Sequence, residues 1–208
     1  MLRFGLSAVV MAALFSGTAA AGGIAPSAEE IRPILIGSML PDAPLRTADG
    51  DPSTLRAALS GQAGVLIVYR GGWCPVCTRQ FASLRSVVEP IRELGLGLFA
   101  MSVDDPERLI AGRDPETPFT LLSDSELQAS TALGLAFRVT DDAVERLEGF
   151  GLDLEGNAVS IERVLPVPAV FVFDAEGVIT FSYANPNYAV RCDPGVILAA
   201  ATAAAAGS

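Results

Sequence analysis

Short apolar runs and amphipathic stretches alternate along most of this 208-residue chain. Apolar runs rich in β-branched and aromatic residues predict buried strands, and three such runs lie at 64–69, 95–103 and 165–174. After the first run, apolar side chains recur at helical spacing, at Phe81, Leu84, Val87 and Val88. The pattern therefore predicts a buried strand that leads directly into an amphipathic helix.

Turn and capping signals predict the remaining elements. Before the first run we expect a strand at 45–47 and a helix at 54–59 that Ser53 caps. After it we expect a helix from Asp104-Asp105-Pro106, a short edge element at 119–124, and helices at 125–133 and 141–147. An insertion at 149–163, with a hairpin at Gly156-Asn157, is expected next. The chain is then expected to end with a strand at 178–183, which forms a hairpin with the apolar run before it, and with a last helix from 193 that dissolves into an alanine-rich tail. This order predicts an α/β fold with a mixed central sheet and helices on both faces.

The first 21 residues have the pattern of a secretory signal peptide. Arg3 gives a positive start, an apolar core follows, and Ala19-Ala20-Ala21 resembles a cleavage site. The apolar core is shorter than the about 20 residues of a membrane-spanning helix, so we expect no integral membrane segment after cleavage; an uncleaved anchor is the alternative. We expect 22–36 to be a linker or a loose first helix, and 37–208 to form one domain exported to a bacterial periplasm.

The charged residues narrow the chemistry. The formal net charge is −10, and all 14 basic residues are arginines, because the chain has no lysine and no histidine. Such a charge argues against binding to nucleic acid or to anionic membranes. Histidine triads, histidine metal clusters, phosphate-loop lysines and Schiff-base lysines are all excluded. The thiols are the strongest nucleophiles that remain, and we expect no cofactor.

Two of the three cysteines stand at the predicted junction of strand and helix, in Arg70-Gly71-Gly72-Trp73-Cys74-Pro75-Val76-Cys77. Pro75 suits a first helical position. The N–H groups and partial charge of a helix start favour a thiolate, so Cys74 is expected to be the nucleophile, with the lower pKa and the greater exposure of the two thiols. Cys77 lies one turn further on the same face, where it can close a disulfide with Cys74. A structural disulfide or half of a zinc site is the alternative.

Cys192 is left over from this pair. It is either a buried, inert thiol or a second resolving or intermolecular thiol. Structural zinc needs four ligands, which three cysteines without histidine do not supply, so we expect no metal site. An exported C-x-x-C pair can rest as a disulfide, and its turnover then requires an external source of electrons.

The motif Trp73-Cys74-Pro75-Val76-Cys77 resembles the W-C-x-x-C active site of thioredoxin-like proteins. The longer stretch from Tyr69 to Cys77 resembles the AhpC/TSA group, the peroxiredoxin-like branch of that superfamily, and the resemblance extends over about 37–200. It is sharpest at the motif, at 165–179 and at 188–191. The resemblance implies a thioredoxin-like three-layer sandwich.

The same resemblance implies roles for four further residues. Pro168 is expected to be cis and to lie against the cysteines. Arg70 and Arg191 are expected to stabilise a Cys74 thiolate or to bind a peroxide oxygen, since a guanidinium offers five donors. Trp73 is expected to pack over the disulfide. Typical peroxiredoxins carry P-x-x-x-[ST]-x-x-C, but, counted from Cys74, Ile67 and Gly71 occupy the proline and hydroxyl places.

Two enzymatic functions remain open from the sequence. In the first, an antioxidant peroxidase, Cys74 is oxidised by a peroxide to a sulfenic acid, Cys77 condenses with it, and an external thioredoxin-like dithiol reduces the disulfide. In the second, the pair reduces protein disulfides. A non-enzymatic module with a structural disulfide is a third possibility, and the sequence does not indicate the oligomeric state.

Overall fold

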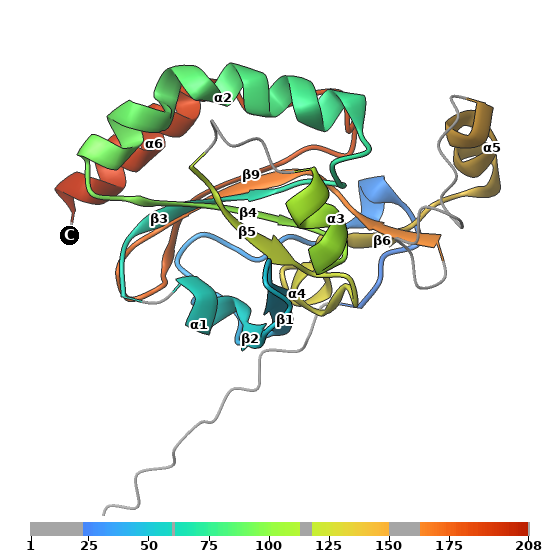
Figure 1. Cartoon of the computed structure of the whole chain (residues 1–208), viewed down its shortest axis with the longest axis horizontal. Helices are drawn as coiled ribbons and strands as arrows, with labels where there is room; N and C mark the ends of the chain where they lie inside the picture. Colours follow the sequence, from blue (N-terminus) through green and yellow to red (C-terminus); the bar gives the residue numbers. More distant parts are fainter. Residues whose placement is uncertain (1–22, 60, 113–117, 150–162, 208) are drawn as a thin grey trace, which may run out of the picture.

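The computed structural model describes residues 23–59, 61–112, 118–149 and 163–207 (Figure 1). Its centre is a seven-stranded sheet in the order β2-β1-β5-β4-β3-β8-β9. The strands are β1 (Pro44–Thr47), β2 (Pro52–Thr54), β3 (Gly64–Val68), β4 (Gly97–Ser102), β5 (Thr120–Ser123), β8 (Ala169–Phe173) and β9 (Ile179–Ala184). Strands β3, β4 and β5 are parallel to one another, while β1, β8 and β9 pair antiparallel with their neighbours. The predicted mixed sheet is confirmed.

Helices cover both faces of this sheet. On one face, α2 (Pro75–Glu93) and α6 (Pro194–Ala206) lie side by side, and α1 (Leu55–Leu59) and α4 (Gln128–Ala132) lie on the other (Figure 1). Two further helices, α3 (Pro106–Ala111) and α5 (Asp141–Gly149), lie near the β6 end of the molecule. None of the described helices is long and apolar enough to cross a membrane.

Each face of the sheet has its own hydrophobic core. Alternate residues of β3 point to opposite sides, as expected for a strand: Val65 and Ile67 join the core beneath α2 and α6, whereas Leu66 and Val68 join the core beneath α1 and α4. All five residues of β3 are buried, which is why this strand appears in the sequence as an unbroken apolar run. The strand is thus a rigid support for the loop that follows it.

A second, two-stranded sheet joins β6 (Ala136–Arg138) to β7 (Val164–Pro166). The segment predicted as a linker or loose helix is attached to this sheet from Ala25 on, because the Ala25 N–H donates to the Ala136 carbonyl and the Arg138 N–H donates to the Ala25 carbonyl, both at 2.9 Å. A short 3-10 helix (Ala28–Glu30) follows. The segment therefore forms part of the folded unit.

Several predicted elements need correction. β5 is not at an edge, because β1 pairs with it on one side and β4 on the other. The apolar run at 165–174 is two strands, β7 and β8, in different sheets. The alanine-rich tail is helical to Ala206. The hydroxyl that accepts from α1 is that of Thr54, not Ser53. The predicted hairpin at Gly156-Asn157 lies outside the described residues.

Candidate active site

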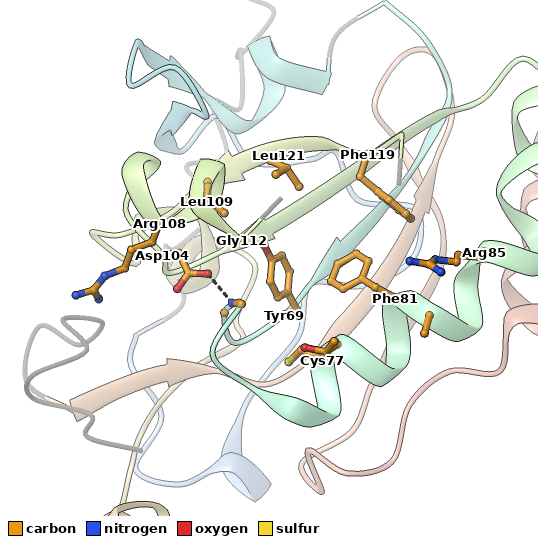
Figure 2. Close-up of a pocket in the computed structure, with 14 residues that line it drawn as sticks. Tyr69, Cys77, Phe81, Arg85, Asp104, Arg108, Leu109, Gly112, Phe119 and Leu121 are labelled. Atoms are coloured by element: carbon orange, nitrogen blue, oxygen red, sulfur yellow. Dashed lines mark hydrogen bonds between the residues drawn. The ribbon is translucent and has the colours of Figure 1, made fainter. Parts of the chain in front are cut away.

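The loop between β3 and α2 is held by a close backbone approach. Gly71 has a φ of 146°, and a Cβ on it would collide with the Trp73 indole nitrogen and lie 2.8 Å from Asp104 Oδ1. The next residue, Gly72, donates its N–H to Asp104 Oδ2 at 2.7 Å (Figure 2). Asp104 follows β4, the strand next to β3, so the loop is tied to the same end of the sheet.

Both cysteines of the motif stand at the start of α2. Cys74 is the N-cap residue, Pro75 is the first helical residue, and the Cys77 N–H donates to the Cys74 carbonyl at 2.9 Å. Both are free thiols in this structure, as is Cys192. The predicted difference in exposure between the two thiols is small, because Cys74 is 2% exposed and Cys77 is 1% exposed. The pair is therefore covered by the surrounding loop and helices.

The two thiols share a hydrogen bond that separates their pKa values. The Cys77 S–H donates to Cys74, and this contact is the largest cause that lowers the pKa of Cys74, to about 6. Burial of Cys74 opposes the shift, whereas the N–H groups of Cys77 and Val76 and the charge of Arg70 add to it. The pKa of Cys77 is raised by the same contact and by burial. The predicted direction for Cys74 is therefore confirmed. At neutral pH the reduced pair carries one negative charge, shared between two sulfurs.

Arg191 lies against Cys77 and not against Cys74. Its Nη2 is 3.4 Å from Cys77 Sγ, its Nη1 donates to Gln80 Oε1 at 2.7 Å, and its Nε donates to the Tyr188 carbonyl at 2.8 Å. The expectation that Arg191 supports a Cys74 thiolate is thus corrected. The Arg191 charge and the Arg70 backbone N–H both lower the pKa of Cys77, against its burial.

Arg70 is buried between two aromatic rings. Its Cζ lies 4.6 Å from the centre of the Tyr188 ring and 5.3 Å from that of Trp73. Burial lowers the pKa of the guanidinium, and negative charge on Cys74 and Cys77 raises it. Arg70 thus acts on the pair through its charge, as expected, while Trp73 packs on Arg70 and on the core that contains the cysteines.

A cavity of about 150 Å³ opens beside Cys77 (Figure 2). Its apolar wall includes Tyr69, Phe81 and Phe119, whose rings meet edge to face at 5.0 and 5.3 Å. Its polar wall includes Asp104, whose pKa is raised by burial, and the two arginines Arg85 and Arg108. Cys77 lines this cavity and Cys74 does not. A small substrate in the cavity would therefore meet Cys77 first.

Pro168 is trans, as are all the described peptide bonds, so the expected cis bond is wrong. The chain runs extended from β7 to β8 through this residue: the Val167 N–H donates to the Leu135 carbonyl and the Asn185 N–H donates to the Pro168 carbonyl. A proline just before a strand needs no N–H partner, and most X–Pro bonds in such settings are trans. Pro168 lines a second cavity, together with Arg70.

Cys192 is only 5% exposed and lies in the same hydrophobic core as the motif cysteines. Burial raises its pKa. This favours the inert thiol over the resolving one. Among the described residues, no group of three Cys, Asp or Glu side chains lies close enough to hold a metal ion.

Sequence reasoning missed Gln80, Asp104 and Tyr188 as members of the site. Gln80 follows Cys77 by three residues and so lies on the same helix face, a signal that was present in the sequence.

Counting the peroxiredoxin motif from Cys77 also changes its interpretation: Cys74 then occupies the hydroxyl place and Arg70 the proline place. The thiol of Cys74 stands where the family has a hydroxyl.

Comparisons with known proteins concern the family of this chain. A family model described as the AhpC/TSA family matches residues 36–182. Peroxiredoxin Bcp of Escherichia coli K12 is 28% identical over 132 residues, which cover 61% of this chain and 83% of that protein. A peroxiredoxin of Methanothermobacter thermautotrophicus is 29% identical over 163 residues, 69% of this chain and 77% of its own.

Solved structures show the same fold at lower identity. Peroxiredoxin 5 from Alvinella pompejana superposes with a TM-score of 0.63 at 17% identity, over 82% of this chain and 99% of that one. Reduced Prx3 in complex with H2O2 from Vibrio vulnificus superposes with a TM-score of 0.61 at 21% identity, over 81% and 99%. The predicted thioredoxin-like sandwich is thus confirmed.

Proposed function

Because the chain belongs to the AhpC/TSA family, whose members are peroxiredoxin-type, thiol-dependent peroxidases, we propose that Cys74 and Cys77 form its redox centre and reduce peroxides. The observation that carries the proposal is the position of Cys77, which lines a cavity and lies 3.4 Å from Arg191 Nη2. A guanidinium at that distance stabilises an anionic sulfur and can donate to a peroxide oxygen.

In this proposal Cys77, and not Cys74, attacks the peroxide. The proton of the pair moves along the S–H···S hydrogen bond to Cys74, which leaves Cys77 as the thiolate beside Arg191. Cys77 Sγ attacks one peroxide oxygen and the O–O bond breaks, so the sulfur is oxidised to a sulfenic acid and the departing oxygen takes a proton to leave as an alcohol or water. Cys74 then attacks the sulfenic sulfur, and water leaves as the disulfide forms. One thiolate, one thiol, ROOH and H⁺ thus become a disulfide, ROH and H2O.

An external dithiol of the thioredoxin type returns the pair to its reduced form by thiol–disulfide exchange. We also propose that the protein acts as an antioxidant outside the cytoplasm, in a bacterial periplasm. The leader-like pattern of residues 1–21 supports this. Mass spectrometry of the protein from its native host should then find an N-terminus near Gly22, and an intact chain in the cytosol would contradict export.

The test of the function is peroxide consumption by single-cysteine variants, with dithiothreitol as reductant. Cys77→Ser should not react with peroxide. Cys74→Ser, reduced beforehand and then freed of dithiothreitol, should react once and stop, with a sulfenic acid that dimedone traps on Cys77 and mass spectrometry locates. Cys192→Ser, in which a buried thiol outside the pair is replaced, is the matched control and should turn over normally.

A sulfenic acid on Cys74 in the Cys77→Ser variant, formed at the wild-type rate, would reverse the two roles. Oxidation by peroxide that is much slower than reduction of a protein disulfide such as insulin would favour the alternative function, a thioredoxin-like protein-disulfide reductase.

A further inference from the structure

The side chain of Arg70 is buried, and its Nε has no hydrogen-bond acceptor among the described residues. The residue is 4% exposed. Its contacts are the rings of Trp73 and Tyr188. A cation–π contact contributes about 0.5–2 kcal/mol, whereas the effective cost of burying an ion is several kcal/mol. The rings alone therefore do not offset the burial of this charge.

In the reduced protein the cysteine pair supplies the missing negative charge. Charges on Cys74 and Cys77 both raise the pKa of Arg70, against the effect of burial. Formation of the Cys74–Cys77 disulfide removes that negative charge, because both sulfurs become neutral. The buried Arg70 cation then has no counter-charge on the cysteine side.

A second cavity, of about 280 Å³, is lined by Arg70 and by neither cysteine of the pair. Its charged lining residues are Arg70, Arg138 and Glu29, in a chain whose net charge is −10. The rest of its wall is largely apolar, from Phe137, Val139, Pro166, Pro168, Pro186 and Tyr188. Such a cavity suits one small ligand with an apolar body and a single negative charge.

We propose that this cavity is a carboxylate site whose affinity depends on the redox state of the cysteines. A small monocarboxylate binds with its carboxylate on Arg70 and its apolar part on the proline and aromatic wall. It binds more tightly when the pair is a disulfide, because the thiolate no longer competes for the same cation. A planar carboxylate matches the fork of a guanidinium, while a phosphate dianion would also face Glu29 with its second charge.

Linkage makes the coupling reciprocal. A ligand that prefers the oxidised protein stabilises the disulfide and lowers the reduction potential of the pair. A tenfold preference corresponds to a lowering of about 30 mV at saturation for this two-electron couple. The redox dependence rests on the proposed function of the pair, whereas the carboxylate site itself does not.

The test uses benzoate as the probe and the fluorescence of Trp73 as the readout, since Trp73 is the only tryptophan and lies on Arg70. The disulfide form, prepared with diamide, should bind benzoate about tenfold more tightly than the reduced form. The double variant Cys74→Ser/Cys77→Ser has no thiolate and should bind like the disulfide form even in the presence of reductant. Saturating benzoate should lower the reduction potential of the wild-type pair by about 30 mV.

Arg70→Gln should abolish binding in both redox states. Arg79→Gln, which removes the same charge from an exposed position of α2, should leave binding unchanged. If Arg70→Gln does not fold, Arg70→Lys keeps the charge without the fork and should bind more weakly while preserving the difference between redox states. Equal affinity in both states, no saturable binding to the disulfide form, or full binding by a folded Arg70→Gln would each overturn the proposal.

These outcomes are independent of peroxide turnover. A protein that consumed no peroxide but bound benzoate through Arg70 in its disulfide form would refute the peroxidase and keep the carboxylate site. A protein that consumed peroxide but bound benzoate equally in both states would keep the peroxidase and refute the redox dependence of the site.

Discussion

Cys74 and Cys77 differ in what their surroundings offer each sulfur. Cys74 has the helix N–H groups and the Cys77 proton, which favour its thiolate, and Cys77 has Arg191 and the cavity, which favour contact with a substrate. The sequence predicted the effect of the helix N–H groups on Cys74, because an N-cap position can be recognised locally. It did not predict the effect of the Cys77 proton, which is the largest cause of the low pKa. It also did not predict that Arg191 contacts Cys77, because Arg191 is 114 residues away and its partner depends on how α6 approaches α2.

The shared proton has a measurable consequence. Alkylation of the reduced pair by iodoacetamide should rise with pH through a midpoint of about 6, the pKa of Cys74. The largest cause of that low pKa is the hydrogen bond from Cys77, so Cys77→Ala should move the midpoint up toward the ordinary thiol value of about 8.5. Mass spectrometry should locate the label on Cys74. A midpoint that stays near 6 in Cys77→Ala would show that the helix and Arg70 suffice without the second thiol.

Among the elements, those with strong local patterns were predicted well and those set by pairing were not. The buried run of β3, the glycine turn and α2 follow from apolar spacing and Pro75. The central position of β5 depends on β1, which precedes it by about 75 residues and leaves no local signal in the sequence of β5. The change of sheet at Val167 and Pro168 did have a local signal, because Pro166 and Pro168 interrupt the apolar run at 165–174.

The buried carboxylate of Asp124 caps the start of α4. Asp124 is 1% exposed and accepts the N–H groups of Ala129 and Ser130 at 2.9 and 2.7 Å. Burial raises its pKa to about 6, against the hydrogen bonds, which lower it. A folded-state pKa above the unfolded one means that the folded protein binds the proton more tightly. The contribution of Asp124 to stability is therefore largest below about pH 4 and is lost as the pH rises to about 6.

A comparison of the wild type with Asp124→Asn isolates this titration. Asparagine loses part of the cap at every pH, so the variant should be less stable by a constant amount. In addition, the unfolding free energy of the wild type relative to the variant should fall by up to about 3 kcal/mol as the pH rises from about 4 to 6, since about two pKa units separate the two states. Urea unfolding across this range measures it. A difference that is flat or that rises with pH would contradict the raised pKa.

At the scale of the whole molecule, the folded unit begins before the residues that the family model matches. The family model begins at residue 36, but the preceding segment is bound to β6 through Ala25 and to the end of α4. The Arg32 N–H donates to the Gly134 carbonyl at 3.2 Å and the Ile34 N–H to the Leu133 carbonyl at 3.0 Å. The prolines and small residues of this segment suggested a linker because backbone hydrogen bonds to a distant strand leave no apolar pattern in the sequence.

A chain that begins at Gly37 should consequently be less stable than one that begins at Gly23. It lacks the four backbone hydrogen bonds described above, each worth about 1 kcal/mol, so we expect a loss of roughly 4 kcal/mol and a thermal midpoint roughly 10 °C lower. Gly134→Ala provides the matched control. Its Cβ would collide with the Arg32 carbonyl, and its φ of 71° strains any side chain. In the longer chain the substitution incurs both penalties, and in the shorter chain only the backbone strain. It should therefore destabilise the longer chain more, by calorimetry, and equal effects in the two chains would mean that the segment does not dock on α4.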